Sequence, residues 1–209
     1  MTAFRRYARL IVQLVKITFF DTANKDAEYR RTIFYNFKDW GGVYIKFLQV
    51  MAGASKFMEG WGGPREMEVF SQAPREDLNL ADYVDLSQFS HLSAEPVAAG
   101  SFALVYRGKL LSGEDVAVKI LRPSIKHNLK RNLKILGHLC KFFAHFFPRT
   151  LVDYDEAYAA CAKMFLLETD YRREIANQEY FAKLYYDHPR VVIPKVYRNL
   201  SSRDVIVQD

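Results

Sequence analysis

The chain has 209 residues, of which 50% are hydrophobic and 26% are charged, and these proportions exclude a disordered or low-complexity chain. Thirty Lys and Arg residues against 24 acidic residues give a formal net charge of +6, which is mild for a nucleic-acid-binding protein and compatible with an anionic membrane surface. The only two cysteines, Cys140 and Cys161, exclude a disulfide framework and a four-cysteine zinc site, so we expect a reducing compartment and no bound structural metal.

The first residues carry no targeting or membrane-spanning segment that we recognise. Met1–Phe20 lacks the small-residue cleavage site of a secretory signal peptide. The longest apolar stretch, Leu10–Phe20, is interrupted by polar residues and is shorter than the roughly 20 residues that a membrane span requires. We therefore expect a soluble or peripheral protein, on the cytoplasmic side of a membrane or on the matrix side of an organellar membrane.

Residues 1–94 are predicted to form a helical N-terminal extension. Met1–Arg31 has seven basic and three acidic residues, with apolar residues at helical spacing. Such a basic amphipathic helix can lie in a bilayer interface or pack on its own domain, and the sequence favours neither. A second helical run covers about Ala27–Met58 with a break at Gly41-Gly42, and Gly60–Pro64 is a strong helix breaker. We expect only short helices and loops in Arg65–Leu92.

Residues 95–209 are predicted to form a second unit with strands as well as helices. Pro96–Leu110 and Glu114–Leu121 are rich in Val and Ala and are separated by Ser112-Gly113, which predicts a β-hairpin. Two long helices are then expected, followed by two closing strands. Their predicted ranges are, in chain order, Ile125–Phe147, Tyr154–Tyr186, Val191–Tyr197 and Val205–Val207.

The helix at Ile125–Phe147 has two distinct stripes. Its apolar stripe includes Cys140, which we expect in the core, as we do Cys161 in the next helix. The other stripe is basic, and no acidic residue occurs from Ile120 to Thr150. A solvated helix face and an anionic partner or membrane both remain open as explanations of this stripe. The aromatic residues do not form the strand motifs of RNA-binding domains, so we expect no nucleic-acid partner.

Two segments of the hairpin suggest nucleotide chemistry. Ala98–Val105 has the spacing of the kinase loop G-x-G-x-x-G-x-V, with alanine at the first and third glycine positions. A small-residue turn of this kind also occurs through packing alone. Lys119, at the end of Val116-Ala117-Val118-Lys119, lies on the returning strand, from which it could reach nucleotide phosphates. Its acidic partner would come from the following helix, where Asp170 and Glu174 can share a face whereas Glu168 and Asp170 cannot.

These segments, with several others in the same order, resemble the ABC1 (UbiB/AarF-like) atypical kinases. Pro96–Ala103 is similar to the family's alanine-rich loop P-[IV]-A-A-A-S-I-G, and Val116–Lys119 with Arg122-Pro123 is similar to V-A-V-K-x-x-R-P. Glu168–Glu174 with Asn177 resembles E-x-D-[YF]-x-x-E-x-x-N, and Ile193–Tyr197 with Leu200-Ser201 resembles V-P-x-V-Y and its turn. Ile45–Gln49 lies where the family has K-x-G-Q. The resemblance covers about residues 41–209.

The resemblance implies an α+β fold, namely a protein-kinase-like N-lobe of antiparallel sheet plus an αC-type helix, preceded by the helical extension. It implies ATP or ADP with Mg²⁺ as cofactor, with Lys119 on the phosphates and paired with Glu174. Lys46 and Gln49 would fold over the site and meet Glu168 and Asp170 as gating residues. The nucleotide contacts implied are Ala98, Ala99, Gly100, Ser101, Phe102, Ala103, Val105, Ala117, Lys119 and Glu174.

The same resemblance implies a role for the chain. Family members are thought to act as ATPases or small-molecule kinases that support isoprenoid-quinone (ubiquinone) biosynthesis at membranes, which makes an isoprenoid lipid a possible partner. Transphosphorylation of proteins is not expected, because the extension blocks the place where a peptide would bind.

Four departures from the family pattern affect this expectation. Leu48 replaces the glycine of K-x-G-Q, Gly100 replaces the third alanine of the loop, and Leu104 stands where the family usually has Gln. The fourth departure is at Val205–Asp209, the position of the family's hinge strand, after which no catalytic-loop Asp or metal-binding Asp occurs in the sequence. We therefore expect no catalytic residue and no Mg²⁺ ligand in this chain, and a large lobe from a separate chain if the enzyme is split. The alternative is a non-catalytic, pseudokinase-like module that binds a membrane or a partner.

Overall fold

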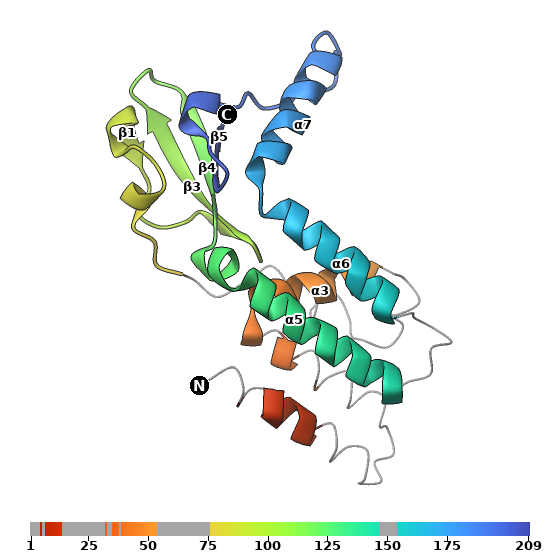
Figure 1. The fold of residues 1–209 in the computed structure, drawn as a ribbon. Coiled ribbons are helices and arrows are strands. Elements are labelled where there is room, and N and C mark those ends of the chain that lie inside the picture. Colours follow the sequence, from red (N-terminus) through yellow and green to blue (C-terminus); the bar gives the residue numbers. More distant parts are fainter. Residues whose placement is uncertain are drawn as a thin grey trace.

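A computed structural model describes residues 5, 7–13, 32, 35–37, 39–53, 76–146 and 154–209. It contains one antiparallel sheet and, beside it, a layer of the helices α3, α5 and α6, with α7 continuing from α6 alongside the sheet (Figure 1). The helices are α3 (Gly42–Gly53), α5 (Pro123–Phe146), α6 (Tyr154–Glu168) and α7 (Tyr171–Leu184). The predicted α+β architecture, an antiparallel sheet with helices beside it, is confirmed.

The sheet has five strands, and the hairpin predicted from the sequence lies at its centre. The strands are β1 (Phe89–Leu92), β2 (Ala98–Ala99), β3 (Ala103–Leu110), β4 (Asp115–Leu121) and β5 (Val205–Gln208). They are ordered β1-β3-β4-β5, and β2 also pairs with β3. The turn between β3 and β4 contains Gly113 at φ +102°, a backbone conformation that favours glycine.

Two strand assignments from the sequence were wrong. β1 lies where only short helices and loops were expected, because its central Ser90 and His91 are polar and exposed and interrupt any apolar pattern. The sheet therefore begins before residue 95, inside the segment assigned to the extension. Val191–Tyr197 is not a strand, and only Val196 makes an isolated bridge, to Gln208. Pro194 has no N–H to donate to a ladder, which explains the irregular backbone there.

The helix expected over Tyr154–Tyr186 is in fact two helices, α6 and α7. Asp170 separates them with an extended backbone (φ −126°, ψ 93°), and its side chain accepts a hydrogen bond from the N–H of Arg172. Asp is a strong helix N-cap, so this residue starts a new helix. The break at Gly41-Gly42 is present, since both glycines have positive φ and α3 begins at Gly42. The Gly60–Pro64 breaker lies outside the described residues.

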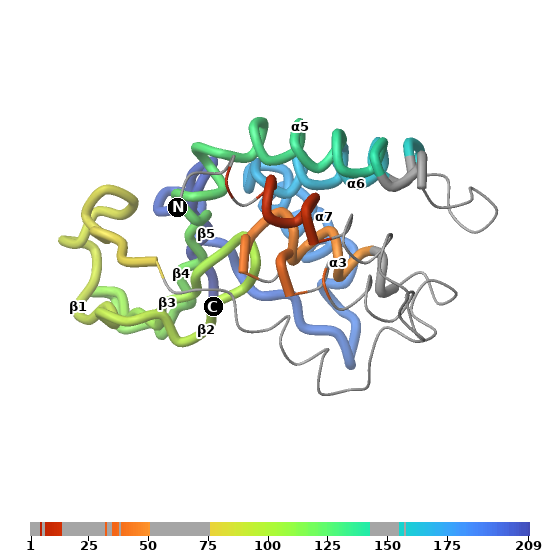
Figure 2. Tube along the Cα trace, turned by 90° about the horizontal axis from the view of Figure 1, so that it is seen from below, coloured from red at the N-terminus to blue at the C-terminus, as the bar shows by residue number. Residues whose placement is uncertain are grey.

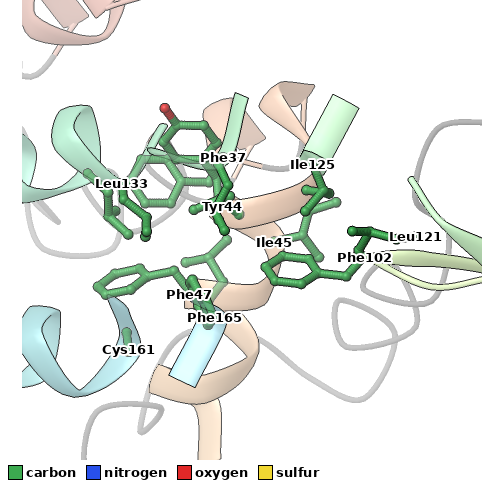
Figure 3. Close-up of a cluster of buried hydrophobic side chains, with 14 of the residues drawn as sticks. Phe37, Tyr44, Ile45, Phe47, Phe102, Leu121, Ile125, Leu133, Cys161 and Phe165 are labelled. Carbon is green, nitrogen blue, oxygen red and sulfur yellow. The ribbon is translucent and has the colours of Figure 1, made fainter. Parts of the chain in front are cut away.

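The two faces of the sheet lead to separate hydrophobic cores. One core lies on the face of Leu104, Tyr106, Val118, Ile120 and Val207 and is covered by residues 78–92. The second core joins the helical layer to the sheet and includes Ile45, Phe102, Leu121, Ile125 and Phe165, which Figure 3 shows converging from α3, the loop between β2 and β3, β4, α5 and α6. Cys140 and Cys161 are both buried in this second core, as expected. Burial raises the pKa of the Cys140 thiol to about 12, so it behaves as a small apolar side chain.

The described part of the N-terminal helix packs on the second core. Leu10 is fully buried there, and the hydroxyl of Tyr7 lies 2.5 Å from that of Tyr44. Arg5, Arg9 and Val12 remain exposed. No helix in the described part of the chain combines the length and apolar character that crossing a membrane requires.

Candidate functional site

The site is centred on an ion pair between the sheet and α7. Nζ of Lys119 on β4 lies 2.6 Å from Oε1 and 2.9 Å from Oε2 of Glu174. The two side chains are 30% and 44% exposed, so they face open space rather than the core. Lys119 Nζ also lies 4.8 Å from the ring centroid of Tyr171, a cation–π distance. These contacts hold the ammonium group at the open face of the sheet.

Glu174 reaches Lys119 because α7 begins at a fixed point. Tyr171 at the first turn is buried, and its N–H donates to the carbonyl oxygen of Arg203, just before β5. Ile175 is buried in the same core, together with Ile206 of β5. Glu174 lies between these two anchors, so the first turn of α7 is fixed against the strand next to β4.

Asp170 interacts with two arginines near the start of α7. Its carboxylate accepts hydrogen bonds from Nε and Nη2 of Arg172 at 2.9 and 2.6 Å, and Nε of Arg203 lies 3.9 Å away. The hydrogen bonds from Arg172 are the main reason that the pKa of Asp170 is lowered to about 2. The position of Asp170 therefore indicates a helix cap that orients Glu174.

Asp170→Asn is expected to lower the free energy of unfolding by about 1 kcal/mol at neutral pH, because the amide caps the helix without the negative charge. The folded-state pKa is below the value of about 3.9 in an unfolded chain, so the carboxylate stabilises the fold above that value and loses its effect as the pH falls toward 2. Denaturant unfolding at several pH values measures this. A difference between wild type and variant that stays constant from pH 6 to pH 2 would contradict the assignment.

The alanine-rich loop is a tight turn between β2 and β3. The N–H of Gly100 donates to the carbonyl oxygen of Ala103 at 2.8 Å. Ser101 and Phe102 at its tip are buried, and the Phe102 ring packs edge-on against Phe165 of α6 at 5.4 Å between centroids. The side chain of Phe102 thus belongs to the core, and any contact with a nucleotide would be made by its backbone. Figure 2 shows this loop, after β2, turning toward α3.

Gly100, the departure in this loop, does not require glycine. Its φ is not positive, and a Cβ built there would come no closer than 3.6 Å, to the carbonyl oxygen of Ala103. We expect Gly100→Ala, which restores the family residue, to change the free energy of unfolding by less than about 1 kcal/mol, because alanine restricts the unfolded chain and fits the folded one. Gly42→Ala is the contrast: φ is +42° and the new Cβ would lie 2.6 Å from Ile125 Cδ1. Thermal unfolding of the two variants measures this difference in stability. An equal loss of stability in Gly100→Ala and Gly42→Ala would contradict the loop geometry.

A shallow apolar hollow of about 430 Å³ lies on the same face of the sheet as Lys119. It is lined by Val97, Val105 and Ala117 among others, and Asp209 lies at its edge. Val105 is the cross-strand neighbour of Lys119, and Ala117 is two residues before it on β4. The hollow and the ammonium group are therefore adjacent, which is the arrangement that a ligand with a flat apolar part and an anionic part requires.

Two of the predicted gating residues, Lys46 and Glu168, are in contact. Nζ of Lys46 on α3 lies 3.0 Å from Oε1 of Glu168, the last residue of α6. Gln49 is one turn later on α3 and half-buried. Leu48, which replaces the family glycine, is accommodated because its side chain is buried in the second core. That these residues act as gating residues at a nucleotide site stays a prediction.

The residues present fit a nucleotide better than a metal ion alone. A lysine beside a small-residue turn and an apolar hollow suits phosphates and a base, and the phosphates would bring Mg²⁺ with them. Among the residues that the structure describes, no three His, Cys, Asp or Glu side chains are grouped as metal ligands. Sequence reasoning misses two residues, one that contacts the alanine-rich loop and one that pairs with the first. Arg122 enters the sequence analysis only as part of the R-P motif, and no sequence pattern marks Glu76, its acidic partner.

Comparison with known proteins points to one family. The sequence model of the ABC1 atypical kinase-like domain matches residues 80–209. Protein ACTIVITY OF BC1 COMPLEX KINASE 1, chloroplastic, of Arabidopsis thaliana is 37% identical over 123 residues, covering 58% of this chain and 18% of the relative. AarF domain-containing kinase 1 of Drosophila melanogaster is 29% identical over 177 residues, covering 80% of this chain and 34% of the relative.

A solved structure shares the fold. The chain is similar to Rv3197 from Mycobacterium tuberculosis, solved as a complex with erythromycin, with a TM-score of 0.52 and 24% identity over 99% of this chain and 48% of that one. The chain therefore spans less than half the length of each of these three proteins.

Proposed function

Because the chain belongs to the ABC1 atypical kinase-like family, we propose that it supplies the small-lobe half of an ATP- or ADP-binding site. The observation that carries the proposal is the Lys119–Glu174 ion pair at the open face, next to the apolar hollow and on the same hairpin as the alanine-rich loop. In this arrangement Lys119 holds the phosphates as a point charge, and Glu174 keeps its ammonium group in place. The base occupies the hollow against Val105 and Ala117.

The rest of the catalytic machinery lies outside these 209 residues in this proposal. Phosphoryl transfer depends on Mg²⁺ to neutralise the phosphates, and a large lobe would bring the carboxylates that hold it. The contact of Lys46 with Glu168 supports a role of the extension in closing the nucleotide site. An extension in that position favours hydrolysis or a small-molecule acceptor over a peptide acceptor.

Calorimetric titration of the 209-residue chain with Mg-ATP, Mg-ADP and adenosine tests the proposal. We expect saturable binding of all three, with the nucleotides tighter than adenosine because Lys119 adds a charge-assisted contact. Ala117→Leu is expected to weaken all three ligands at least fivefold by filling the hollow, because residue 117 faces it. Lys109→Leu is the matched control, since Lys109 is exposed on β3 and does not line the hollow. A wild-type chain without saturable binding, or equal effects of both variants, would overturn the proposal.

We further propose that this nucleotide use supports isoprenoid-quinone biosynthesis at a membrane, which rests on the sequence resemblance. The expected result is a reduced quinone content, measured by mass spectrometry, in cells whose only copy of the protein carries Ala117→Leu. An unchanged quinone content, with a protein that has lost nucleotide binding in vitro, would contradict this role.

A second candidate function is peripheral binding to an anionic membrane, and the exposed basic face of α5 favours it. The exposed residues of that face are Lys126, Lys130, Lys134, His138 and Lys141, and α5 contains no acidic residue. In this proposal Lys130→Gln with Lys134→Gln reduces co-sedimentation with vesicles that contain 30% anionic lipid, whereas Lys163→Gln with Lys183→Gln, on exposed positions of α6 and α7, does not. Equal binding to neutral and anionic vesicles would exclude it.

A further inference from the structure

Arg122 is a buried cation placed directly behind the alanine-rich loop. Its side chain is only 2% exposed, although it lies between the end of β4 and the start of α5. Nε donates to the carbonyl oxygen of Gly100 at 2.8 Å, and Nη1 donates to Oε1 of Glu76 at 3.1 Å. Burying a guanidinium costs free energy unless the group is paired, so these two contacts are needed to offset the burial of Arg122.

The contacts of Arg122 fix the backbone on both sides of Ser101. Its side chain donates to the carbonyl oxygen of Gly100, and its main-chain N–H donates to the carbonyl oxygen of Phe102 at 2.9 Å. In a planar trans peptide the N–H points opposite to the C=O. The carbonyl of Gly100 faces the guanidinium, and so the N–H of Ser101, in the same peptide unit, points away from it. Arg122 therefore sets the orientation of the Gly100–Ser101 peptide, which presents its N–H on the side opposite the guanidinium.

Glu76 holds Arg122 in this orientation. Its Oε1 accepts from Nη1 of Arg122 and from Oγ of Ser124, and its Oε2 accepts from the N–H of Ser124 at 3.2 Å. The carboxylate thus lies at the first turn of α5, where a negative charge is favourable. Glu76 belongs to the extension and precedes residue 80, where the match to the family model begins. The extension is thereby connected, through one side chain, to the conformation of the loop.

We propose that Glu76 and Arg122 are positioning residues for nucleotide phosphates: they hold the Gly100–Ser101 peptide so that an N–H, and not a carbonyl oxygen, faces the phosphates. The inference rests on the proposed nucleotide-binding function and adds the residues that set its phosphate affinity. Loss of either contact frees the peptide to rotate, and a carbonyl oxygen turned toward a phosphate repels it. The effect is confined to the phosphate end of the ligand, because the hollow for the base is built from other residues.

The test compares ligands with and without phosphates on two variants of the full 209-residue chain. Arg122→Lys keeps the charge but lacks the fork that reaches Gly100 and Glu76 together, and Glu76→Gln keeps the shape and an acceptor oxygen. We expect calorimetry to show a loss of Mg-ATP affinity of at least fivefold for Arg122→Lys and at least threefold for Glu76→Gln, with adenosine affinity unchanged within twofold. Asp204→Asn is the matched control, because the Asp204 carboxylate pairs with Lys126, in the same turn of α5.

The possible outcomes separate this inference from the proposed function. A parallel loss of ATP and adenosine affinity shows that the pair only supports the fold and overturns the inference, as does unchanged ATP affinity in Glu76→Gln. If Asp204→Asn weakens ATP as much as the two variants, the effect is not specific to the loop, and the inference is again wrong. A wild-type chain that binds neither ligand overturns the proposed function first, and this inference with it. Because Glu76→Gln is nearly isosteric, the test does not depend on whether Arg122→Lys folds.

Discussion

Replacing Lys119 with methionine is expected to lower the affinity for Mg-ATP by about tenfold to hundredfold and to leave the affinity for adenosine unchanged. A hydrogen bond to a charged group contributes about 1.5–3 kcal/mol, which corresponds to this range of affinity. Methionine keeps the length and apolar stem of the side chain, so it still packs against the ring of Tyr171 but no longer places a charge over it. The loss is therefore assigned to the phosphate contact.

The fold should tolerate this change, which makes the binding experiment interpretable. The Lys119–Glu174 pair is 30% and 44% exposed, and an exposed ion pair contributes at most about 1 kcal/mol to stability. Glu174 is left without its cation but faces solvent rather than the core. Denaturant unfolding of Lys119→Met should accordingly match that of Lys109→Met, which removes an exposed lysine from β3. Retained Mg-ATP affinity in Lys119→Met would show that the pair is structural and that phosphates bind elsewhere.

The sequence predicted those parts of the fold that depend on local patterns. The central hairpin follows from Val- and Ala-rich segments around Gly113, and α5 follows from apolar spacing over its 24 residues. The sequence order, Lys119 followed by acidic residues on a later helix, predicts an ion pair. The structure forms it between Lys119 and Glu174, which are 55 positions apart. In that case the family resemblance, and not the spacing, selected Glu174.

The parts that the sequence did not predict depend on single polar residues or on distant contacts. Asp170 divides one expected helix into two, because a cap with an extended backbone overrides a continuous helical pattern. β1 pairs with β3 although its own pattern contains two exposed polar residues. The contact between Arg122 and Glu76 joins residues 46 positions apart, and no periodicity or charge run links them. Such pairs become visible only when the burial of each side chain is known.

Phe165→Ala is expected to lower the free energy of unfolding by about 3–5 kcal/mol, the range for a fully buried aromatic residue. Phe165 is 0% exposed, and Figure 3 shows it in the second core together with Phe102 and Phe47. The substitution leaves a cavity under the alanine-rich loop, since Phe102 loses its edge-on neighbour. Denaturant unfolding followed by circular dichroism measures the loss.

The neighbouring Leu166 supplies the matched control, because it lies on the same helix and is 47% exposed. Leu166→Ala should change the stability by less than about 1 kcal/mol, since it removes little buried surface. If Phe165→Ala costs no more than Leu166→Ala, the helical layer does not pack against the loop as the structure shows. A large loss for Phe165→Ala alone would mean that α6 and the alanine-rich loop share one core. Any ligand that orders the loop should then also stabilise the helical layer, and Mg-ATP should raise the unfolding midpoint of wild type.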